Sequence, residues 1–344
     1  MNKLWNGATF PKLDEMSPIK NIEYANAHTA IEGEYQFLLG AAIIKHKGVL
    51  YASWGNSLRN ENDDNTVLAG ARSYDGGKSW VEYERISKKD KGFGRSHGVF
   101  FEHSGRLYAF CPKARYDKID TYPDLKTEGY LLNESGVWEC LGIVIDGDFW
   151  PMCEPICLDN GNILMAGLKS DGQAAVAICN TNNLTKWEMK TIPNPNGIEY
   201  WGETTVLKYP DKLLAVIRKG KDLYALVSES YDNGVTWSGI EESNFRITSS
   251  KMYAGTLSNG KSYLVFSSKV KDYRDTLCIA VGKEGFDKSF VIRHGFDAPP
   301  RFWKRNEWSY PYAYEDKETK KLYVAYAKNK EDCEIAIIPT ESLE

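Results

Sequence analysis

Short apolar segments separated by brief polar turns recur along the whole chain, and no segment keeps the period of a long helix. Apolar runs on either side of turns such as His46-Lys47-Gly48 are typical of β-hairpins. The pattern predicts six hairpins, with the paired segments Gly40–Ile44 and Val49–Trp54, Val99–Phe101 and Leu107–Phe110, Pro155–Leu158 and Ile163–Ala166, Thr204–Leu207 and Leu213–Ile217, Thr256–Leu257 and Tyr263–Phe266, and Tyr312–Tyr314 and Leu322–Tyr326.

Two copies of an eight-residue pattern mark further turns. Ser73–Trp80 and Ser230–Trp237 both read Ser-x-Asp-x-Gly-x-Ser/Thr-Trp. The aspartate and serine side chains can accept hydrogen bonds from backbone N–H groups in a tight turn, and the glycine tolerates positive φ. The tryptophan buries a large ring beside the turn. Eroded copies of the pattern end at Trp138, Trp187 and Phe290.

The spacing of these copies predicts the architecture. A repeat of about 50 residues, with strands between the turns, has the size of one four-stranded propeller blade. We therefore expect an all-β fold, a six-bladed β-propeller of four-stranded antiparallel blades with Asp-box turns. The unit that begins at Tyr310 is too short for four strands, so the stretch before Gly40 is expected to supply its outer strand. We expect a single domain over residues 1–344.

Composition limits the class of protein. The chain has 344 residues, of which 42% are hydrophobic and 13% aromatic, which is enough for a large core. A net charge of −4 argues against nucleic acid or anionic membranes as partners. No apolar run reaches the length of about 18 residues that a membrane span needs.

The cysteines and the N-terminus bear on the compartment. Seven cysteines, none in a CxxC pair, are expected to be reduced and mostly buried. Met1–Asn6 lacks the apolar segment of a secretion signal, so we expect a cytoplasmic protein, or a periplasmic or secreted one if a signal has been trimmed. The sequence has no HExxH motif, EF-hand loop, P-loop or GxGxxG, so we expect neither a metal nor a cofactor. The oligomeric state stays open.

Polar and aromatic residues stand where the innermost strand of each predicted blade begins. These strands line the central channel of a propeller, and a closed core has no need of charge at a strand start. We therefore expect a carbohydrate site at one mouth of the channel, with tryptophans as stacking faces for a sugar ring. The candidates are Arg95, His97, Trp150, Glu154, Trp201, Glu203, Lys251, Tyr253, Trp308 and Tyr310.

The boxes around Asp75 and Asp232 resemble the Asp-boxes of the sialidase (neuraminidase) superfamily, and the resemblance spans roughly residues 38–338. It implies a six-bladed propeller in which the boxes lie at the blade periphery, so both aspartates form turns rather than catalyse. It also implies a glycan or oligosaccharide as the substrate and a glycosidase as the activity.

The resemblance assigns roles to single residues. Glu203 looks like the glutamate that activates a tyrosine nucleophile, and Tyr310 resembles that tyrosine. Arg218 and Arg274 look like two of the three arginines that hold a substrate carboxylate. The family's acid lies in the loop before the first box, where Asp64 is the candidate here. The chemistry is coherent, because a carboxylate beside a phenol can accept its proton.

The sequence departs from the family at the first inner strand. There the family has an arginine, and this chain reads Gln36–Ala41, so the arginine triad lacks its first member. This argues against sialic acid itself as the substrate. His97 and Glu154 have no counterpart in the family. Glu154 and Glu203 could instead form the carboxylate pair of an ordinary glycosidase.

Three functions stay open. The first is an exo-acting, sialidase-like glycoside hydrolase that releases a terminal sugar, acidic sugars included. The second is a polysaccharide lyase on a uronate-containing glycan, with His97 and either Tyr253 or Tyr310 as base and acid. The third is a non-catalytic carbohydrate-binding propeller. The polar inner-strand starts favour the hydrolase.

Overall fold

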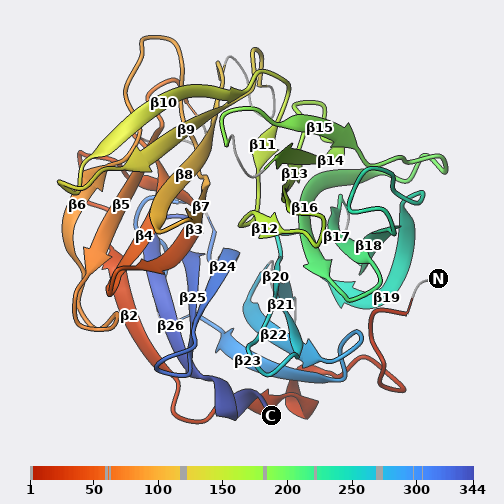
Figure 1. The fold of residues 1–344 in the computed structure, drawn as a ribbon. Coiled ribbons are helices and arrows are strands. Elements are labelled where there is room, and N and C mark those ends of the chain that lie inside the picture. Colours follow the sequence, from red (N-terminus) through yellow and green to blue (C-terminus); the bar gives the residue numbers. More distant parts are fainter. Residues whose placement is uncertain are drawn as a thin grey trace.

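A computed structural model describes residues 3–58, 61, 63–116, 122–180, 184–220, 223–268, 274–296, 298–303 and 305–344. Within these residues the strands form six sheets, which stand as blades around a central axis (Figure 1). The predicted all-β class and the six-bladed propeller are therefore confirmed.

Apart from two outer strands that the N-terminal segment adds to blades five and six, each blade is an antiparallel meander whose strands run in sequence order from the channel outward. Blades one to three contain β3 (Phe37–His46), β4 (Val49–Ser57), β5 (Val67–Ser73) and β6 (Val81–Arg85); β7 (Val99–His103), β8 (Arg106–Lys113), β9 (Lys126–Leu132) and β10 (Trp138–Ile145); and β11 (Trp150–Pro151), β12 (Ile156–Cys157), β13 (Asn162–Leu168), β14 (Ala174–Asn180) and β15 (Glu188–Thr191). Blade three has a split inner strand, because β11 and β12 both pair with β13.

The remaining blades follow the same order. Blades four to six contain β16 (Tyr200–Lys208), β17 (Leu213–Lys219), β18 (Leu223–Ser230) and β19 (Glu241–Ile247); β20 (Tyr253–Thr256), β21 (Ser262–Ser268), β22 (Thr276–Gly282) and β23 (Lys288–His294); and β24 (Trp308–Asp316), β25 (Lys321–Lys328) and β26 (Asp332–Pro339). Strands such as β22 are buried on both faces between neighbouring blades, which is why they read as continuous apolar runs.

The N-terminal segment runs along the outside of the ring. A short 3-10 helix, η1 (Leu13–Glu15), precedes β1 (Ser17–Pro18), which pairs in parallel with β23 at the edge of blade five. Next, β2 (Glu23–His28) pairs antiparallel with β26 and forms the outer strand of blade six. The red β2 therefore lies beside the blue C-terminal strands (Figure 1), and the chain ends in the 3-10 helix η2 (Thr340–Leu343).

The two complete boxes form the same turn. The Asp75 carboxylate accepts hydrogen bonds from the N–H groups of Lys78 and Ser79 and from the hydroxyls of Ser73 and Ser79. The Trp80 indole N–H donates to the carbonyl of Gly77 at 3.1 Å. The equivalent bond in the second box, from Trp237 to the carbonyl of Gly234, is 2.9 Å.

The eroded boxes keep parts of this geometry. Asn133 takes the place of the aspartate, and its Oδ1 accepts from the N–H groups of Ser135 and Val137. The Trp187 indole donates to the carbonyl of Leu184, which reproduces the tryptophan contact. The residues between Asn180 and Leu184 lie outside the described part of the chain.

Candidate functional site

A tyrosine, a glutamate and an arginine meet at the channel-side ends of β16 and β24. The Tyr310 hydroxyl donates to Glu203 Oε1 at 2.7 Å, and Arg218 Nη1 donates to Glu203 Oε2 at 2.8 Å. The same Arg218 nitrogen lies 3.4 Å from the Tyr310 hydroxyl. Both Glu203 and Tyr310 are buried. The three groups therefore form one closed hydrogen-bonded cluster, which we call the mouth cluster.

Backbone irregularities aim these side chains. The pairing of β24 with β25 slips between Ser309 and Tyr312, and Tyr310 has φ 55°. A β-bulge re-aims a side chain, and a non-glycine residue in the left-handed region is costly unless its surroundings enforce it. The pairing of β16 with β17 slips between Tyr200 and Thr204, which brackets Glu203. Both partners of the hydrogen bond thus sit on departures from regular strand.

The protonation of Tyr310 follows from its surroundings. Burial, and then the Glu203 carboxylate, raise the pKa of Tyr310 well above its usual value, against a smaller opposing effect of Arg218. The phenol therefore keeps its proton at neutral pH and acts as a donor. Glu203 Oε1, already in hydrogen-bond contact, is placed to accept that proton.

Arg274 borders the mouth cluster, just before β22. Its guanidinium lies 5.6 Å from the centre of the Tyr310 ring and donates to the carbonyl of Ser249 and to Glu307. Ser249 is shared, because its hydroxyl accepts from Arg218 Nε at 3.1 Å. Arg218 and Arg274 thus reach the same corner of the site, and the carboxylate of Glu307 offsets part of their charge.

His97 packs on the other side of Tyr310. Its ring meets the Tyr310 ring edge-on at 5.5 Å and the Trp150 ring at 5.0 Å. A Cβ on Gly40 would lie 2.3 Å from the His97 ring, so glycine is required for this close approach. Burial, followed by the charges of Lys251 and Lys330, holds the pKa of His97 well below its usual value. The imidazole is therefore neutral.

A second tyrosine–carboxylate contact lies beyond the mouth cluster. Tyr253 hydrogen-bonds Glu154, and burial raises the pKa of Glu154 to about 8. The Tyr253 and Tyr312 rings lie 4.3 Å apart, and the Lys251 ammonium sits 5.7 Å from each ring. Burial lowers the pKa of Lys251 to about 8, and its Nζ donates to the carbonyl of Pro311. Glu154 thus has Tyr253 as its partner, whereas Glu203 has Tyr310.

Two other predicted site residues, Arg95 and Trp308, are buried and bonded to protein groups. The Arg95 side chain is 0% exposed, and its guanidinium pairs with Glu128 and Asp90. A substrate contact would have to break this buried ion pair, so the surroundings of Arg95 fit a structural role. Trp308 is also buried, and its indole donates to the carbonyl of Gly295, which leaves it no open stacking face.

Trp201 and Asp64 are more accessible. Trp201 is half-buried and packs against the cluster that contains Trp150, Met152 and Leu168. Asp64 is half-buried in the loop between β4 and β5, and its Oδ1 accepts from the N–H of Tyr116 at 3.1 Å.

Sequence reasoning missed Lys330. Its ammonium lies 5.8 Å from the Tyr310 ring and 5.7 Å from the Phe37 ring, and it pairs with Glu61 at 2.9 Å. A lysine thus stands beside the strand in which the family's first arginine is absent. Lys330 occupies a tight turn between β25 and β26, with φ 55°, and nothing in its local sequence separates it from any surface turn lysine.

Among the described residues, no group of three or more His, Cys, Asp or Glu side chains is placed to hold a metal ion. Across the same part of the chain, no helix is long and apolar enough to span a membrane.

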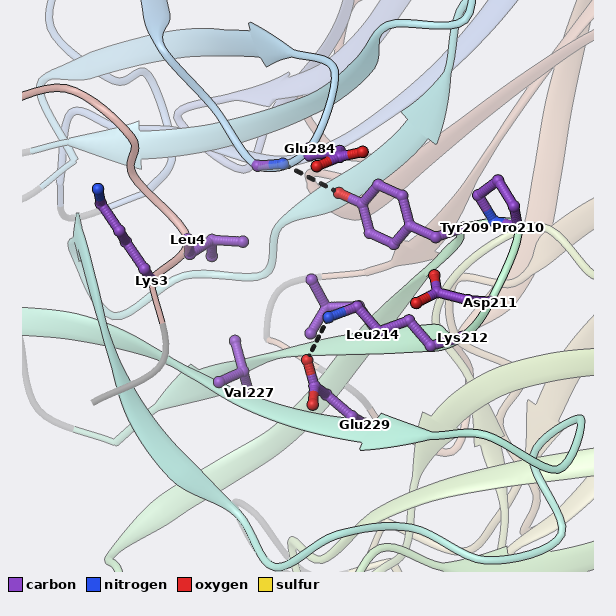
Figure 2. A pocket seen from close by; sticks show the side chains of 11 residues that line it. Lys3, Leu4, Tyr209, Pro210, Asp211, Lys212, Leu214, Val227, Glu229 and Glu284 are labelled. Atoms are coloured by element: carbon purple, nitrogen blue, oxygen red, sulfur yellow. Dashed lines mark hydrogen bonds and ion pairs between the residues drawn. The ribbon is translucent and has the colours of Figure 1, made fainter.

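A pocket of about 350 Å³ lies away from the mouth cluster. It is formed by the turn after β16, the turn after β22 and the N-terminal segment, and Figure 2 shows Tyr209 and the Lys212–Glu229 ion pair facing it. Its lining residues include no member of the mouth cluster.

The fold and the sequence define the class of protein. The described residues form a six-bladed Asp-box propeller with a buried tyrosine–glutamate–arginine cluster, and solved sialidases have the same fold. The chain belongs to the BNR repeat-like domain family, which it matches over residues 149–324, just over half of its length. No curated protein sequence matches the chain significantly.

Solved structures share the fold at low sequence identity. A Dyadobacter fermentans protein of unknown function has a TM-score of 0.72 at 17% identity, and the match covers 93% of this chain and 100% of that one. The intramolecular trans-sialidase from Ruminococcus gnavus, in complex with oseltamivir carboxylate, has a TM-score of 0.70 at 12% identity, with 93% and 98% covered.

Trypanosoma rangeli sialidase in complex with sialic acid has a TM-score of 0.67 at 14% identity. The match covers 95% of the present chain, which spans only 60% of the trypanosomal one. At these identities the likeness extends to the fold alone.

Proposed function

We propose that this protein is a sialidase-like glycoside hydrolase that releases a terminal sugar from a glycan, with Tyr310 as nucleophile and Glu203 as its base. The observation that carries the proposal is the 2.7 Å hydrogen bond from the buried Tyr310 hydroxyl to Glu203. A buried phenol on a strained backbone, bonded to a carboxylate, has no evident structural purpose at a channel mouth.

The reaction has two steps. In the first, the Tyr310 oxygen attacks the anomeric carbon, its proton passes to Glu203, and the bond to the leaving oxygen breaks. Asp64 is the candidate to protonate that leaving oxygen. In the second, water attacks the anomeric carbon of the glycosyl–tyrosine and gives up a proton to the Asp64 carboxylate. The bond from that carbon to the tyrosine oxygen breaks, and Glu203 returns its proton to restore the phenol. Trypanosoma rangeli sialidase has been captured as a covalent intermediate with a difluorinated sialic acid.

The charges around the mouth cluster favour an acidic sugar. Arg218, Arg274 and Lys330 all lie within hydrogen-bond or ring contact of Tyr310. A tyrosine is a suitable nucleophile when the anomeric centre carries a carboxylate, because an anionic nucleophile would be repelled. Lys330 offers a cation on the side where the first inner strand has no arginine.

The test is sugar release from a panel of terminal-sugar glycosides, acidic and neutral, sialosides included. We expect release by the wild type and a loss of about 10³-fold or more in kcat for Glu203→Gln and Tyr310→Phe. Tyr231→Phe is the matched control, because it removes another tyrosine–carboxylate hydrogen bond, to Glu229, at an exposed site. A fluorinated glycoside of the released sugar should label Tyr310, as read by peptide mass spectrometry.

Other results would replace the proposal. An unsaturated product that absorbs in the ultraviolet, lost in Tyr253→Phe or His97→Ala, would identify a lyase. Sugar binding without any product from a folded wild type would identify a binding propeller. Release that persists in Glu203→Gln would move the chemistry to another carboxylate, with Glu154 the first to examine.

A further inference from the structure

A groove of about 420 Å³ runs between blades six and one, on the outer side of the propeller. One wall comes from the end of β2, the outer strand of blade six, and the other from the outer strands of blade one. The residues that line it are Asn26, Ala27, His28, Thr29, Trp54, Ala71, Trp80, Val81 and Tyr83. The groove shares no residue with the mouth cluster, and Trp80, the last residue of the first Asp-box, is part of its lining.

The lining of the groove is uncharged. None of the lining residues in the described part of the chain is Asp, Glu, Lys or Arg. Burial, with a smaller effect of Arg301, lowers the pKa of His28 to about 4, so its imidazole is neutral at pH 7. The pocket of Figure 2, by contrast, is lined by Lys3, Asp211, Lys212, Glu229 and Glu284 among others.

Four of the nine residues that line the groove carry aromatic rings, namely His28, Trp54, Trp80 and Tyr83. Tyr83 is 51% exposed and Val81 45% exposed, which is unusual for large apolar residues side by side on one strand. His28 stacks on Trp54 with ring centres 4.8 Å apart and planes at 21°, and it lies 5.9 Å from Tyr83. The exposed ring of Tyr83 and the Trp54 ring, which His28 covers, thus both line this groove.

The polar atoms next to these rings are unsatisfied. Trp54 Nε1, His28 Nε2 and Asn56 Oδ1 are buried and have no hydrogen-bond partner among the described residues. Asn56 Nδ2 makes only a long contact, 3.4 Å, with the Tyr83 hydroxyl. A buried polar group without a partner is costly. Two of these atoms belong to groove-lining residues and the third to Asn56, which contacts Tyr83, so the groove calls for a ligand that can both donate and accept.

We propose that this groove binds a neutral sugar unit of a glycan, as a secondary site apart from the channel mouth. A sugar ring offers an apolar face for Tyr83 and hydroxyls that donate and accept, and it carries no charge. The unpaired atoms are shielded while His28 lies on Trp54. Binding is therefore expected to turn the His28 ring aside and to expose the Trp54 indole to the sugar.

The test is sugar binding to the full chain by saturation-transfer NMR and calorimetry, with N-acetyllactosamine, cellotriose and maltotriose as probes. We expect millimolar binding of at least one probe, weakened roughly ten-fold in Tyr83→Ala because a stacked aromatic face is lost. Tyr74→Ala is the matched control, since Tyr74 is 60% exposed in the box turn of the same blade. His28→Ala should tighten binding by roughly three-fold, because no ring has to be displaced.

The site is separable from the proposed catalysis. Glu203→Gln should leave this binding unchanged, so a failure of the hydrolase proposal would not affect the result. Equal affinity of wild type and Tyr83→Ala, or no binding of any of the three probes, would overturn the proposal. Self-association of the wild type that Tyr83→Ala abolishes, without sugar binding, would also overturn it and identify a second copy of the chain as the occupant.

Discussion

Two kinds of carboxylate in this protein hold hydroxyl groups, and they do so in opposite settings. Asp75, in the first box, is exposed and takes its hydrogen bonds from residues within four positions in the chain. Glu203, at the channel mouth, is buried and takes its hydrogen bonds from Arg218 and from Tyr310, which is 107 positions away. The first arrangement is complete within one turn, whereas the second requires blades four and six to face one another.

The difference separates structural from chemical use of the same functional groups. A turn carboxylate that is saturated by local N–H groups lowers the energy of one backbone conformation and has little left to offer a ligand. A buried carboxylate bonded to a phenol holds a proton acceptor beside a hydroxyl group, at the expense of strained backbone. The changes below test this contrast from the largest expected effect to the smallest.

Gly40→Ala should disturb the mouth most strongly. Gly40 has φ 57°, and a Cβ there would approach the His97 ring to 2.3 Å. Backbone strain and overpacking together should lower the free energy of unfolding by about 2–5 kcal/mol. Because His97 packs on Tyr310, kcat should fall as well. Urea unfolding and initial rates measure the two effects.

Gly48→Ala is the control for that change. Gly48 also has positive φ, 83°, but nothing lies within 4 Å of an added Cβ. It should lose only the backbone contribution, about 1–2 kcal/mol, with kcat unchanged. Equal losses for the two variants would mean that the Gly40–His97 contact contributes nothing.

Glu154→Gln should alter the pH dependence of stability. The pKa of Glu154 is raised to about 8 in the folded protein, from a usual value of 4.5. The folded state then holds a proton that the unfolded state releases, so wild-type stability falls as pH rises through this window. The variant has no carboxyl group at this position, so its stability does not fall in this way. Between pH 5 and pH 8 its free energy of unfolding should rise relative to that of the wild type, on the order of a few kcal/mol.

Urea unfolding at pH 5, 6.5 and 8 gives the comparison. Lys251 affects the free energy of unfolding in the opposite direction, at higher pH. Its pKa is lowered to about 8 in the folded protein, so above pH 8 the folded state loses this proton before the unfolded state does and stability rises with pH. Glu241→Gln, at an exposed position of β19, should parallel the wild type at every pH. Parallel curves for Glu154→Gln would show that the carboxyl ionises normally.

Asp75→Asn and Asp232→Asn should have the smallest effects. Hydrogen bonds from the side chain and N–H of Ser79 lower the pKa of Asp75 to about 2. Hydrogen bonds from the side chain and N–H of Thr236 likewise lower the pKa of Asp232. This stabilisation is present above the unfolded pKa near 4 and is lost as pH falls toward 2. Each variant should melt roughly 1–3 °C below wild type at pH 6 and together with it at pH 2.

The same two box variants should differ from the variants of the mouth cluster in enzymatic activity. Neither box variant should change kcat at pH 6, since each turn lies outside the mouth cluster. A box variant that lost activity while melting normally would contradict the division between turn carboxylates and mouth carboxylates.

The candidate site was predictable only in part, and the reasons are physical. The family resemblance singles out four residues of the candidate site, Glu203, Arg218, Arg274 and Tyr310. The structure places these four side chains in contact with one another. Arg95 stands at an equivalent strand start, but Glu128 and Asp90 hold it.

The opposite case is Lys330. It looks like any turn lysine in sequence, yet its ammonium reaches Tyr310 and Phe37. A charged residue at the start of an inner strand is expected to be buried. Only the neighbouring blades decide whether that residue pairs with a carboxylate of the protein or faces a site that is open to a ligand.

The sequence by itself determined the blades. Apolar runs of strand length, polar turns between them and two box signatures act over fewer than about ten residues, so local propensity and hydrogen bonding are enough to specify them. The number of blades followed from the count of six hairpins.

Tertiary structure alone decided what meets at the centre of the ring. Ring closure brings β24 toward β3 and β16, and the slips in strand pairing at Tyr310 and Glu203 turn their side chains together. Hydrogen bonds between residues more than a hundred positions apart depend on the packing of whole sheets, which no local pattern encodes. The uncharged groove between β2 and blade one exists for the same reason, since its two walls come from blades that meet only when the ring closes.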